Sequence, residues 1–143
     1  MQKVLVTGGA GFIGSNLALT IQERWPKARI TVVDDFRSGS FKNLQGFRGD
    51  VVAKNCVDYT SKTTFDVIFH LASITDTTVH DERLMVHDNV EGFRAILALK
   101  TKKLVYASSA ATYGMDGARM SEKQVPVPAN VYAFSKVILD NLG

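Results

Sequence analysis

The sequence predicts one α/β domain, in which a parallel β-sheet carries helices on both faces. Short runs rich in Val and Ile alternate with longer segments of helical periodicity. The runs show little alternation of apolar and polar residues, which is typical of strands buried on both faces. The chain has 143 residues, 45% of them hydrophobic, and is long enough to bury a core. Repeated strand–helix–strand order favours a parallel, doubly wound sheet.

Five runs are expected to be strands, and three segments between or after them are expected to be helices. The strands occupy residues 3–8, 29–35, 50–57, 65–73 and 103–109. In the first helix, Ile13, Leu17 and Ile21 recur every four residues until a proline prevents continuation. The second helix spans about 81–97, and its apolar stripe is Val86, Val90, Phe93 and Leu97. The last helix is expected from about Asn130, because prolines in the preceding VPVPA disfavour helix.

Composition and charge exclude several kinds of protein. The net charge is +3, but the basic residues are scattered and not interleaved with aromatics, so nucleic acid is not an expected partner. No apolar run is long enough to span a membrane, and the N-terminus does not resemble a signal peptide. The single cysteine, Cys56, excludes an intrachain disulfide and is expected to be a buried apolar residue. We therefore expect a cytoplasmic protein without a membrane partner.

No metal site is expected. The chain has three histidines, His70, His80 and His87, and none is spaced with cysteines or acids as metal ligands are. His70 ends a predicted strand and is expected to be packed in the interior. His80 and His87 are expected at the surface.

Residues 7–14, TGGAGFIG, follow the first predicted strand and open the first predicted helix. Gly8, Gly11 and Gly14 can serve a tight turn, the close approach of a pyrophosphate and the packing of helix on strand. The free N–H groups at the start of the helix would hold the phosphates. Asp34 ends the second strand twenty residues after Gly14, placed to bind a ribose hydroxyl. A Gly-rich turn without a ligand is the alternative, but this context predicts a Rossmann-type dinucleotide site.

A candidate catalytic pair lies in the last predicted helix. Tyr132 and Lys136 are four residues apart and share one face, beside the apolar stripe of Val131, Phe134, Ile138 and Leu142. A phenol is a poor base at neutral pH, but a neighbouring ammonium and a cationic nicotinamide favour the phenolate. Tyr132 could then take a proton from a substrate hydroxyl while hydride leaves the same carbon. Ser109, which ends the fifth strand, would give a hydrogen bond to the reacting oxygen.

Together these segments resemble the extended short-chain dehydrogenase/reductases, and among them the nucleotide-sugar epimerases and dehydratases. The resemblance rests on TGGAGFIG, the acid after the second strand, FHLAS, SSAATYG and YAFSK, and covers essentially the whole chain. The stretches DDFRSGSFKNLQGF and SITDTT (73–78) are most similar to ADP-glycero-manno-heptose 6-epimerases. UDP-glucose 4-epimerases and nucleotide-sugar dehydratases share the catalytic motifs and remain alternatives.

The resemblance implies roles for individual residues. Ser109, Tyr132 and Lys136 match the catalytic residues, and the last two also contact the cofactor. The other cofactor-binding residues implied are Phe12 and Ile13 at the pyrophosphate turn, Asp34 and Asp35 at the adenosine ribose, Asn55 at the adenine, Leu71, Ala72 and Ser73 under the cofactor, and Asn89 steadying that last segment. Many relatives have aspartate at Asn55, whose side-chain carbonyl can still accept the adenine amino group.

The cofactor is expected to be NAD or NADP. Asp34 suits the free ribose hydroxyl of NAD and would repel a 2′-phosphate. The similarity to heptose epimerases instead implies NADP, and Arg37 and Lys42 are close enough in sequence to neutralise that phosphate. We expect a small preference for NADP.

The resemblance also predicts what the sequence lacks. Five strands are expected where about six would complete the sheet, and the C-terminal sugar-nucleotide domain of the family has no counterpart here. We therefore expect residues 1–143 to be the incomplete N-terminal dinucleotide-binding domain of a longer, homo-oligomeric epimerase whose substrate is a nucleotide sugar. Alone, the chain is expected to bind dinucleotide weakly and to catalyse no epimerisation.

Two other functions compete with an epimerase. A dehydratase normally has an Asp-Glu pair near the active-site Thr or Ser, and the stretch GMDGARMSEK after Tyr113 has no adjacent acids. A non-catalytic module that binds dinucleotide would not need Ser109, Tyr132 and Lys136 together. Both features favour the epimerase.

Overall fold

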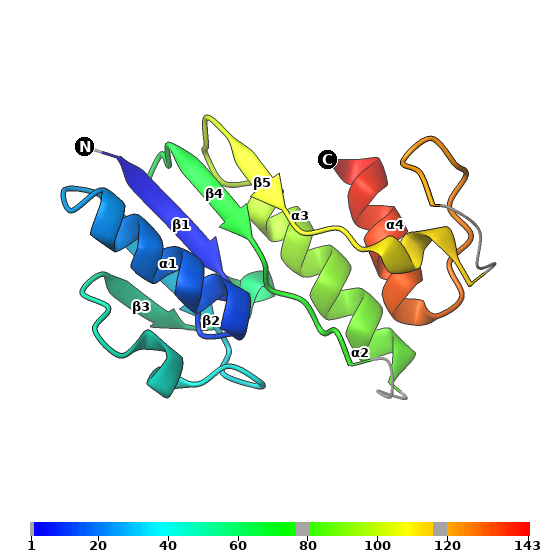
Figure 1. Ribbon diagram of the computed structural model, residues 1–143, viewed down its shortest axis with the longest axis horizontal. Coiled ribbons are helices and arrows are strands. Elements are labelled where there is room, and N and C mark those ends of the chain that lie inside the picture. Colours follow the sequence, from blue (N-terminus) through cyan, green and yellow to red (C-terminus); the bar gives the residue numbers. More distant parts are fainter. Residues whose placement is uncertain (1, 77–80, 116–119) are drawn as a thin grey trace.

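The computed structural model describes residues 2–76, 81–115 and 120–143. His80 and parts of the stretches SITDTT and GMDGARMSEK lie outside these ranges. All five strands are parallel and form one sheet in the order β3-β2-β1-β4-β5 (Figure 1). Their bounds are β1 Lys3–Thr7, β2 Arg29–Asp34, β3 Asp50–Ala53, β4 Val67–His70 and β5 Leu104–Tyr106. The predicted Rossmann-type sheet is confirmed.

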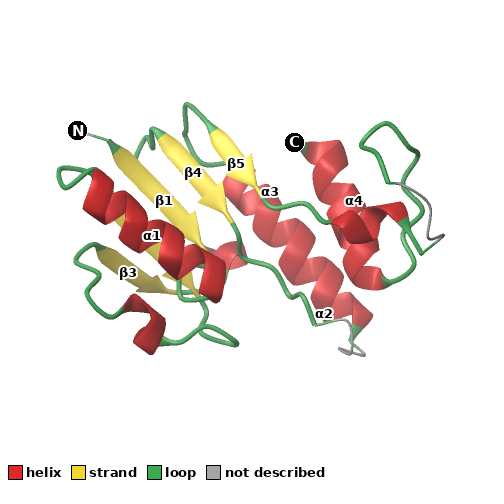
Figure 2. Ribbon diagram, in the orientation of Figure 1, coloured by secondary structure: helices red, strands yellow, loops and turns green. Residues whose placement is uncertain are grey.

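Helices cover both faces of the sheet. The α-helices are α1 (Phe12–Arg24), α2 (Glu82–Val86), α3 (Gly92–Leu97) and α4 (Val131–Leu142). A π-helical turn, His87–Glu91, joins α2 to α3 in one continuous rod, and short 3₁₀ turns follow β2, β3 and β5 at Phe41–Leu44, Cys56–Asp58 and Ala110–Tyr113. Figure 2 shows α1 in front of the strands and the α2–α3 rod behind them, and α4 packs on this rod through Leu139. The prediction of three helical segments is correct.

The alternating side chains of the central strands produce two cores. Val4 and Val6 of β1 pack with Val32 against α1, through Ala18 and Ile21. On the opposite face Leu5, Val33 and Ile68 pack with Ile96 of α3. A third cluster, Val90, Phe93 and Leu139, joins α4 to the rod. Since both faces of β1 are covered, its apolar run carries no period of two.

The observed strands differ from the predicted ones in length and burial. β3, β4 and β5 end at Ala53, His70 and Tyr106, before the predicted ends at 57, 73 and 109. Beyond these points the chain leaves the sheet to form loops. The prediction of burial on both faces was wrong for the edge strands, because Val51 of β3 and Val105 of β5 are 38% and 37% exposed.

The predicted helix stripes were also wrong in part. Ile13, Leu97 and Phe134 were assigned to apolar stripes, but they are 69%, 38% and 50% exposed. In α1 the buried positions are small, Gly14, Ser15 and Ala18, with Ile21, because the helix start packs closely on the glycine loop. In the α2–α3 rod the π turn shifts the register, so that Ile96 is buried in place of Leu97.

Candidate functional site

A cavity of about 740 Å³ lies at the carboxyl edge of the sheet, where the chain leaves β1 and β4 in opposite directions. Ligands of open α/β sheets bind at this topological switch point. The predicted site residues that line the cavity are Gly8, Gly11, Phe12, Ile13, Gly14, Asp34, Asp35, Arg37, Asn55, Leu71, Ala72, Ser73, Tyr132 and Lys136. Lys42, Asn89 and Ser109, although described, do not line it. The segments that follow β1, β2, β3 and β4, together with α4, thus converge on one site.

The three glycines of the first loop are needed for different reasons. Gly8 has φ +68°, and a Cβ there would lie 2.7 Å from the amide nitrogen of Ala72. A Cβ at Gly14 would overlap the carbonyl oxygen of Gly8. At Gly11, by contrast, the only neighbour of a Cβ within the described part of the chain would be that same oxygen, at 3.2 Å. The protein's own packing needs Gly8 and Gly14, whereas Gly11 keeps space free at the cavity.

The start of α1 is suited to bind an anion. Gly11 is the N-cap and supplies no side chain, and the first turn contains no acidic residue. Within the described residues, no acceptor pairs with the amides of Phe12, Ile13 or Gly14. Free amides and the positive end of the helix dipole favour a phosphate group here. The residues present therefore fit the pyrophosphate of a dinucleotide.

Asp34 ties the glycine loop to the end of β2. Its carboxylate accepts from the amides of Ala10 and Phe36, both at 2.9 Å, and the residue is 8% exposed. The second bond accompanies a left-handed conformation at Phe36, with φ 57°. The next residue, Asp35, accepts from the amide of Arg37 at 3.1 Å. Both carboxylates border the cavity beside the glycine loop, where the adenosine ribose is predicted to bind.

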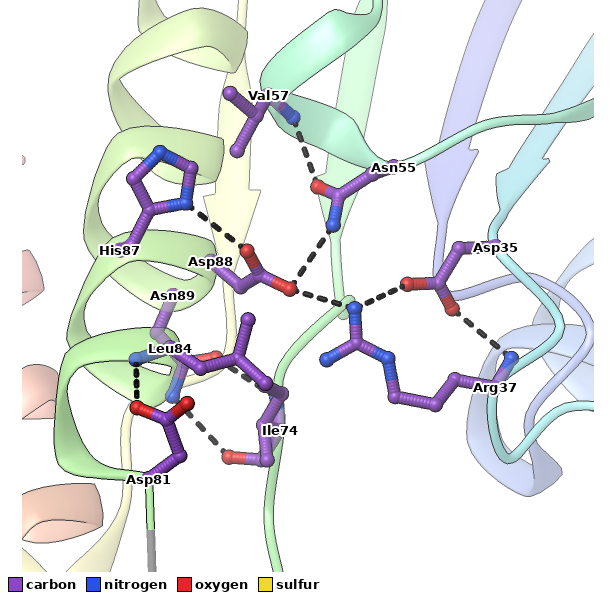
Figure 3. A network of polar contacts seen from close by, with 10 residues as sticks. All are labelled: Asp35, Arg37, Asn55, Val57, Ile74, Asp81, Leu84, His87, Asp88 and Asn89. Atoms are coloured by element: carbon purple, nitrogen blue, oxygen red, sulfur yellow. Dashed lines mark hydrogen bonds and ion pairs between the residues drawn. The ribbon is translucent and has the colours of Figure 1, made fainter.

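An ionic network that the sequence did not reveal links this loop to the π turn (Figure 3). Arg37 Nη2 donates to Asp88 Oδ2 at 2.6 Å and pairs with Asp35 Oδ2 at 3.1 Å. Asn55 Nδ2 also donates to Asp88 Oδ2, at 3.0 Å. Burial alone would raise the pKa of Asp88, but hydrogen bonds from His87, Arg37 and Asn55 outweigh it and lower the pKa. Asp88 is fifty-one residues from Arg37, and no local signal indicates the pairing.

Asn55 uses its side chain within the protein. Its carbonyl oxygen accepts from the amide of Val57 at 3.0 Å, while its amide group contacts Asp88. That oxygen retains a second lone pair, so the predicted bond to an adenine amino group stays a prediction.

Buried polar groups fix the segment after β4. The Thr7 hydroxyl accepts from the amides of Leu71 and Ala72, at 3.2 and 3.3 Å, and lies 2.8 Å from His70 Nδ1. Because those amides occupy the lone pairs, the hydroxyl donates to Nδ1. Burial, together with the charge of Lys136, lowers the pKa of His70 to about 3, so this histidine is packed and neutral.

Asn89 holds the same segment from the helix side. Its side chain accepts from the amide of Ile74 at 2.7 Å and donates to the Ile74 carbonyl at 3.1 Å. A second donation, at 3.0 Å, reaches Ser135 of α4. Asn89 therefore connects the loop under the cavity to the helix that carries Tyr132 and Lys136.

Lys136 lies in the buried face of α4, which corrects its predicted position beside that face. It is 3% exposed, and its Nζ donates to the Ala107 carbonyl at 2.8 Å. Nζ is 5.8 Å from the centre of the Tyr132 ring. The prediction failed because α4 packs through Ala133 and Leu139, which leaves Phe134 outside. Burial lowers the pKa of Lys136 to about 8.

The serines after β5 have distinct environments. Ser109 Oγ accepts from the amide of Ala111 at 3.2 Å and caps the following 3₁₀ turn. Its neighbour Ser108 lines the cavity and donates to Asp140 of α4 at 2.6 Å. The catalytic role of Ser109 stays a prediction, and Ser108 is a cavity residue that the sequence reading missed.

Comparison with known proteins identifies the family. The sequence model of the NAD dependent epimerase/dehydratase family matches residues 4–143. The chain belongs to this family. Among solved structures, the ADP-L-glycero-D-manno-heptose-6-epimerase of Helicobacter pylori is 40% identical and has a TM-score of 0.89, over 99% of this chain and 50% of that one.

Two further solved structures have the same fold and are named for other reactions. An NAD dependent NDP-hexosamine 5,6-dehydratase involved in tunicamycin biosynthesis is 28% identical, with a TM-score of 0.88 over 99% of this chain and 48% of its own. A UDP-galactose 4-epimerase is 25% identical, with a TM-score of 0.87 over 99% and 50%. This epimerase/dehydratase chain thus spans about half the length of the solved relatives.

Lys54 lines the cavity of this epimerase/dehydratase chain, whereas the predicted Lys42 does not. Lys54 directly follows β3, lines the cavity, and its amide donates to the Asp34 carbonyl at 3.0 Å. Lys42 lies in the 3₁₀ turn after β2, away from the cavity. The sequence analysis missed Lys54 because it placed this residue inside a strand at 50–57, whereas β3 ends at Ala53 and pairs with β2, so that Lys54 lies at the same edge of the sheet as Asp34.

The predictions for Cys56 and His87 agree with the structure. Cys56 is buried, and burial raises the pKa of its thiol to about 12, so it is an unreactive core residue. The His87 side chain is 55% exposed. In residues 2–76, 81–115 and 120–143 no cluster of histidine, cysteine and acidic side chains could hold a metal ion. In the same ranges no helix is long and apolar enough to cross a membrane.

The buried lysine predicts a pH dependence of stability. The pKa of Lys136 is about 8 in the folded protein and 10.5 ordinarily, so between these values the unfolded chain binds more protons and stability rises with pH. From the lower to the higher pKa, the free energy of unfolding of the wild type should rise by up to about 3 kcal/mol relative to that of Lys136→Met. Urea titrations at several pH values measure it. For Lys42→Met, which removes an exposed lysine, the free energy of unfolding should depend on pH as it does in the wild type. If Lys136→Met also showed the pH dependence of the wild type, the burial of a charged Lys136 would be contradicted.

Proposed function

We propose that the protein is a nucleotide-sugar epimerase that works through transient hydride transfer, with residues 1–143 as its dinucleotide-binding domain. The observation that carries the proposal is the position of Tyr132 and Lys136, which line the same cavity as the glycine loop. A phosphate-binding loop alone needs neither residue. Their presence beside it supports proton transfer next to a bound nicotinamide.

Different residues of this chain would bind the cofactor and transfer the proton. A bound nicotinamide dinucleotide would supply a hydride acceptor and later return the hydride. Gly11 and the free amides of α1 would hold its pyrophosphate, and Asp34 its adenosine ribose. Tyr132 would take the proton from the sugar hydroxyl and give it back, while Lys136, fixed on Ala107, stabilises the phenolate. The keto sugar that forms in between accepts hydride on its other face, which inverts one carbon without net oxidation.

An ADP-activated heptose is the proposed substrate. The heptose epimerase is 40% identical to this chain, against 28% for the dehydratase and 25% for the UDP-galactose epimerase. The sequence also lacks the adjacent acids after Tyr113 that a dehydratase would use. Assays with several sugars distinguish this substrate from the alternatives.

The test uses the product of the complete reading frame. It is incubated with ADP-glycero-manno-heptose and, separately, with UDP-glucose, and the configuration at each carbon is followed by NMR. Inversion at C6 of the heptose supports the proposal. Interconversion of UDP-glucose and UDP-galactose would support the 4-epimerase alternative, and a dehydrated product would support the dehydratase. A protein that binds dinucleotide but converts none of these sugars would contradict an epimerase of this kind.

We further propose a preference for NADP, based on Lys54 and Arg37 at the adenosine end of the cavity. Lys54→Gln should weaken NADP binding about tenfold, since a charge-assisted hydrogen bond to the 2′-phosphate is lost. Affinity for NAD should stay the same. Calorimetry at fixed salt measures both, and Lys42→Gln, outside the cavity, is the matched control. Equal loss for the two cofactors, or tighter binding of NAD by the wild type, would contradict the preference.

A further inference from the structure

Arg37 is held in place before any ligand arrives. Its side chain crosses from the loop after β2 to the π turn, where Nη2 meets Asp88 at 2.6 Å and Asp35 at 3.1 Å (Figure 3). Arg37 lines the cavity, and its side chain is 44% exposed. The cation nearest to Asp34 in sequence is therefore already shared between two carboxylates.

Asp88 occupies a different position from Asp35. Its side chain is 11% exposed and does not line the cavity, whereas Asp35 does. It accepts from three side chains: Arg37, Asn55 at 3.0 Å and His87 at 3.1 Å. Two of these, Arg37 and Asn55, are cavity residues. Asp88 thus acts on the adenosine end of the site through other residues and without touching a ligand.

The charges of Asp35, Asp88 and Arg37 determine how this network affects the binding of a 2′-phosphate. Asp35 and Asp88 together outweigh the single charge of Arg37, so the network is net negative. A ribose with a free 2′-hydroxyl adds no charge to it. A 2′-phosphate brings about two negative charges and must compete with Asp88 for the guanidinium. The competition affects only the phosphorylated cofactor.

We infer that Asp88 is a specificity-determining positioning residue, which holds Arg37 and so weakens the binding of a 2′-phosphorylated dinucleotide relative to an unphosphorylated one. The inference rests on the proposed dinucleotide site. The preference between NADP and NAD then results from a balance, in which Lys54 and Arg37 attract the phosphate and Asp88 opposes it. If Asp88 only connected the loop to the helix, its replacement would change the affinities for NADP and NAD equally.

The experiment measures Asp88→Asn by calorimetry with NAD and NADP, and with 5′-AMP and 2′,5′-ADP as probes of the adenosine end alone. The ratio of the affinity of the phosphorylated ligand to that of the unphosphorylated one should rise about tenfold in each pair. Glu91→Gln removes one charge from the same π turn, where Glu91 pairs with exposed Arg94, and should leave the ratio unchanged. In Asp88→Asn with Arg37→Gln the gain should disappear.

The outcomes separate the inference from the proposed function. If the wild type binds neither dinucleotide, the proposed site itself is wrong. If it binds them but Asp88→Asn leaves the ratio unchanged or lowers it, the inference is overturned. Circular dichroism checks the fold of each variant, and Asp88→Ser provides the same measurement should the asparagine variant not fold.

Discussion

Replacing Tyr132 with phenylalanine is expected to lower kcat for epimerisation by about a thousandfold, the contribution typical of a positioned acid–base group. The hydroxyl is the only group removed, and the ring keeps its place beside Lys136. Cofactor affinity should therefore change little. The measurement is turnover of the nucleotide sugar by the product of the complete reading frame, with the dinucleotide Kd determined in parallel.

Tyr106→Phe is the matched control for this experiment. Tyr106 lies in β5, packs against Phe93, and does not line the cavity. Its variant should keep the wild-type rate. If Tyr132→Phe retained near wild-type turnover, another group would carry the proton. If it lost dinucleotide binding to the same extent as turnover, Tyr132 would be a binding residue only.

Replacing Gly11 with valine is expected to weaken dinucleotide binding by about a hundredfold, because the side chain would fill the space next to the free amides of α1. The backbone at Gly11, φ −75° and ψ 175°, suits any residue. Inside the protein the new Cβ would meet only the Gly8 oxygen, at 3.2 Å. The less favourable N-cap costs about 1 kcal/mol of stability. Calorimetry and circular dichroism should thus show a folded protein that does not bind.

Gly14→Ala, unlike Gly11→Val, should mainly reduce the stability of the fold. Its methyl group would overlap the Gly8 carbonyl oxygen, so the loop and helix must shift, which destabilises the fold by about 1–3 kcal/mol. The contrast distinguishes a glycine needed for the ligand from one needed for packing. Unchanged dinucleotide affinity in Gly11→Val would show that the pyrophosphate does not bind at this loop.

The sequence determined the architecture and most of the site. Parallel strands place their carboxyl ends on one edge. Residues at the end of each predicted strand, such as Gly8, Asp34 and Ala72, therefore converge although they are far apart in the chain. The helical period likewise placed Tyr132 and Lys136 on one face of α4. These are local rules, and they operate without knowledge of what packs against each element.

Only the tertiary structure decided which faces are buried and which charges meet. Lys136 lies in the interior and Phe134 outside because α4 packs on the α2–α3 rod through Ala133 and Leu139. The π turn brings Asp88 to Arg37, and the pairing of β2 with β3 brings Lys54 to Asp34. Periodicity fixes only the relative directions of side chains along one element. The partner in each case comes from another part of the chain, and packing between elements chooses it.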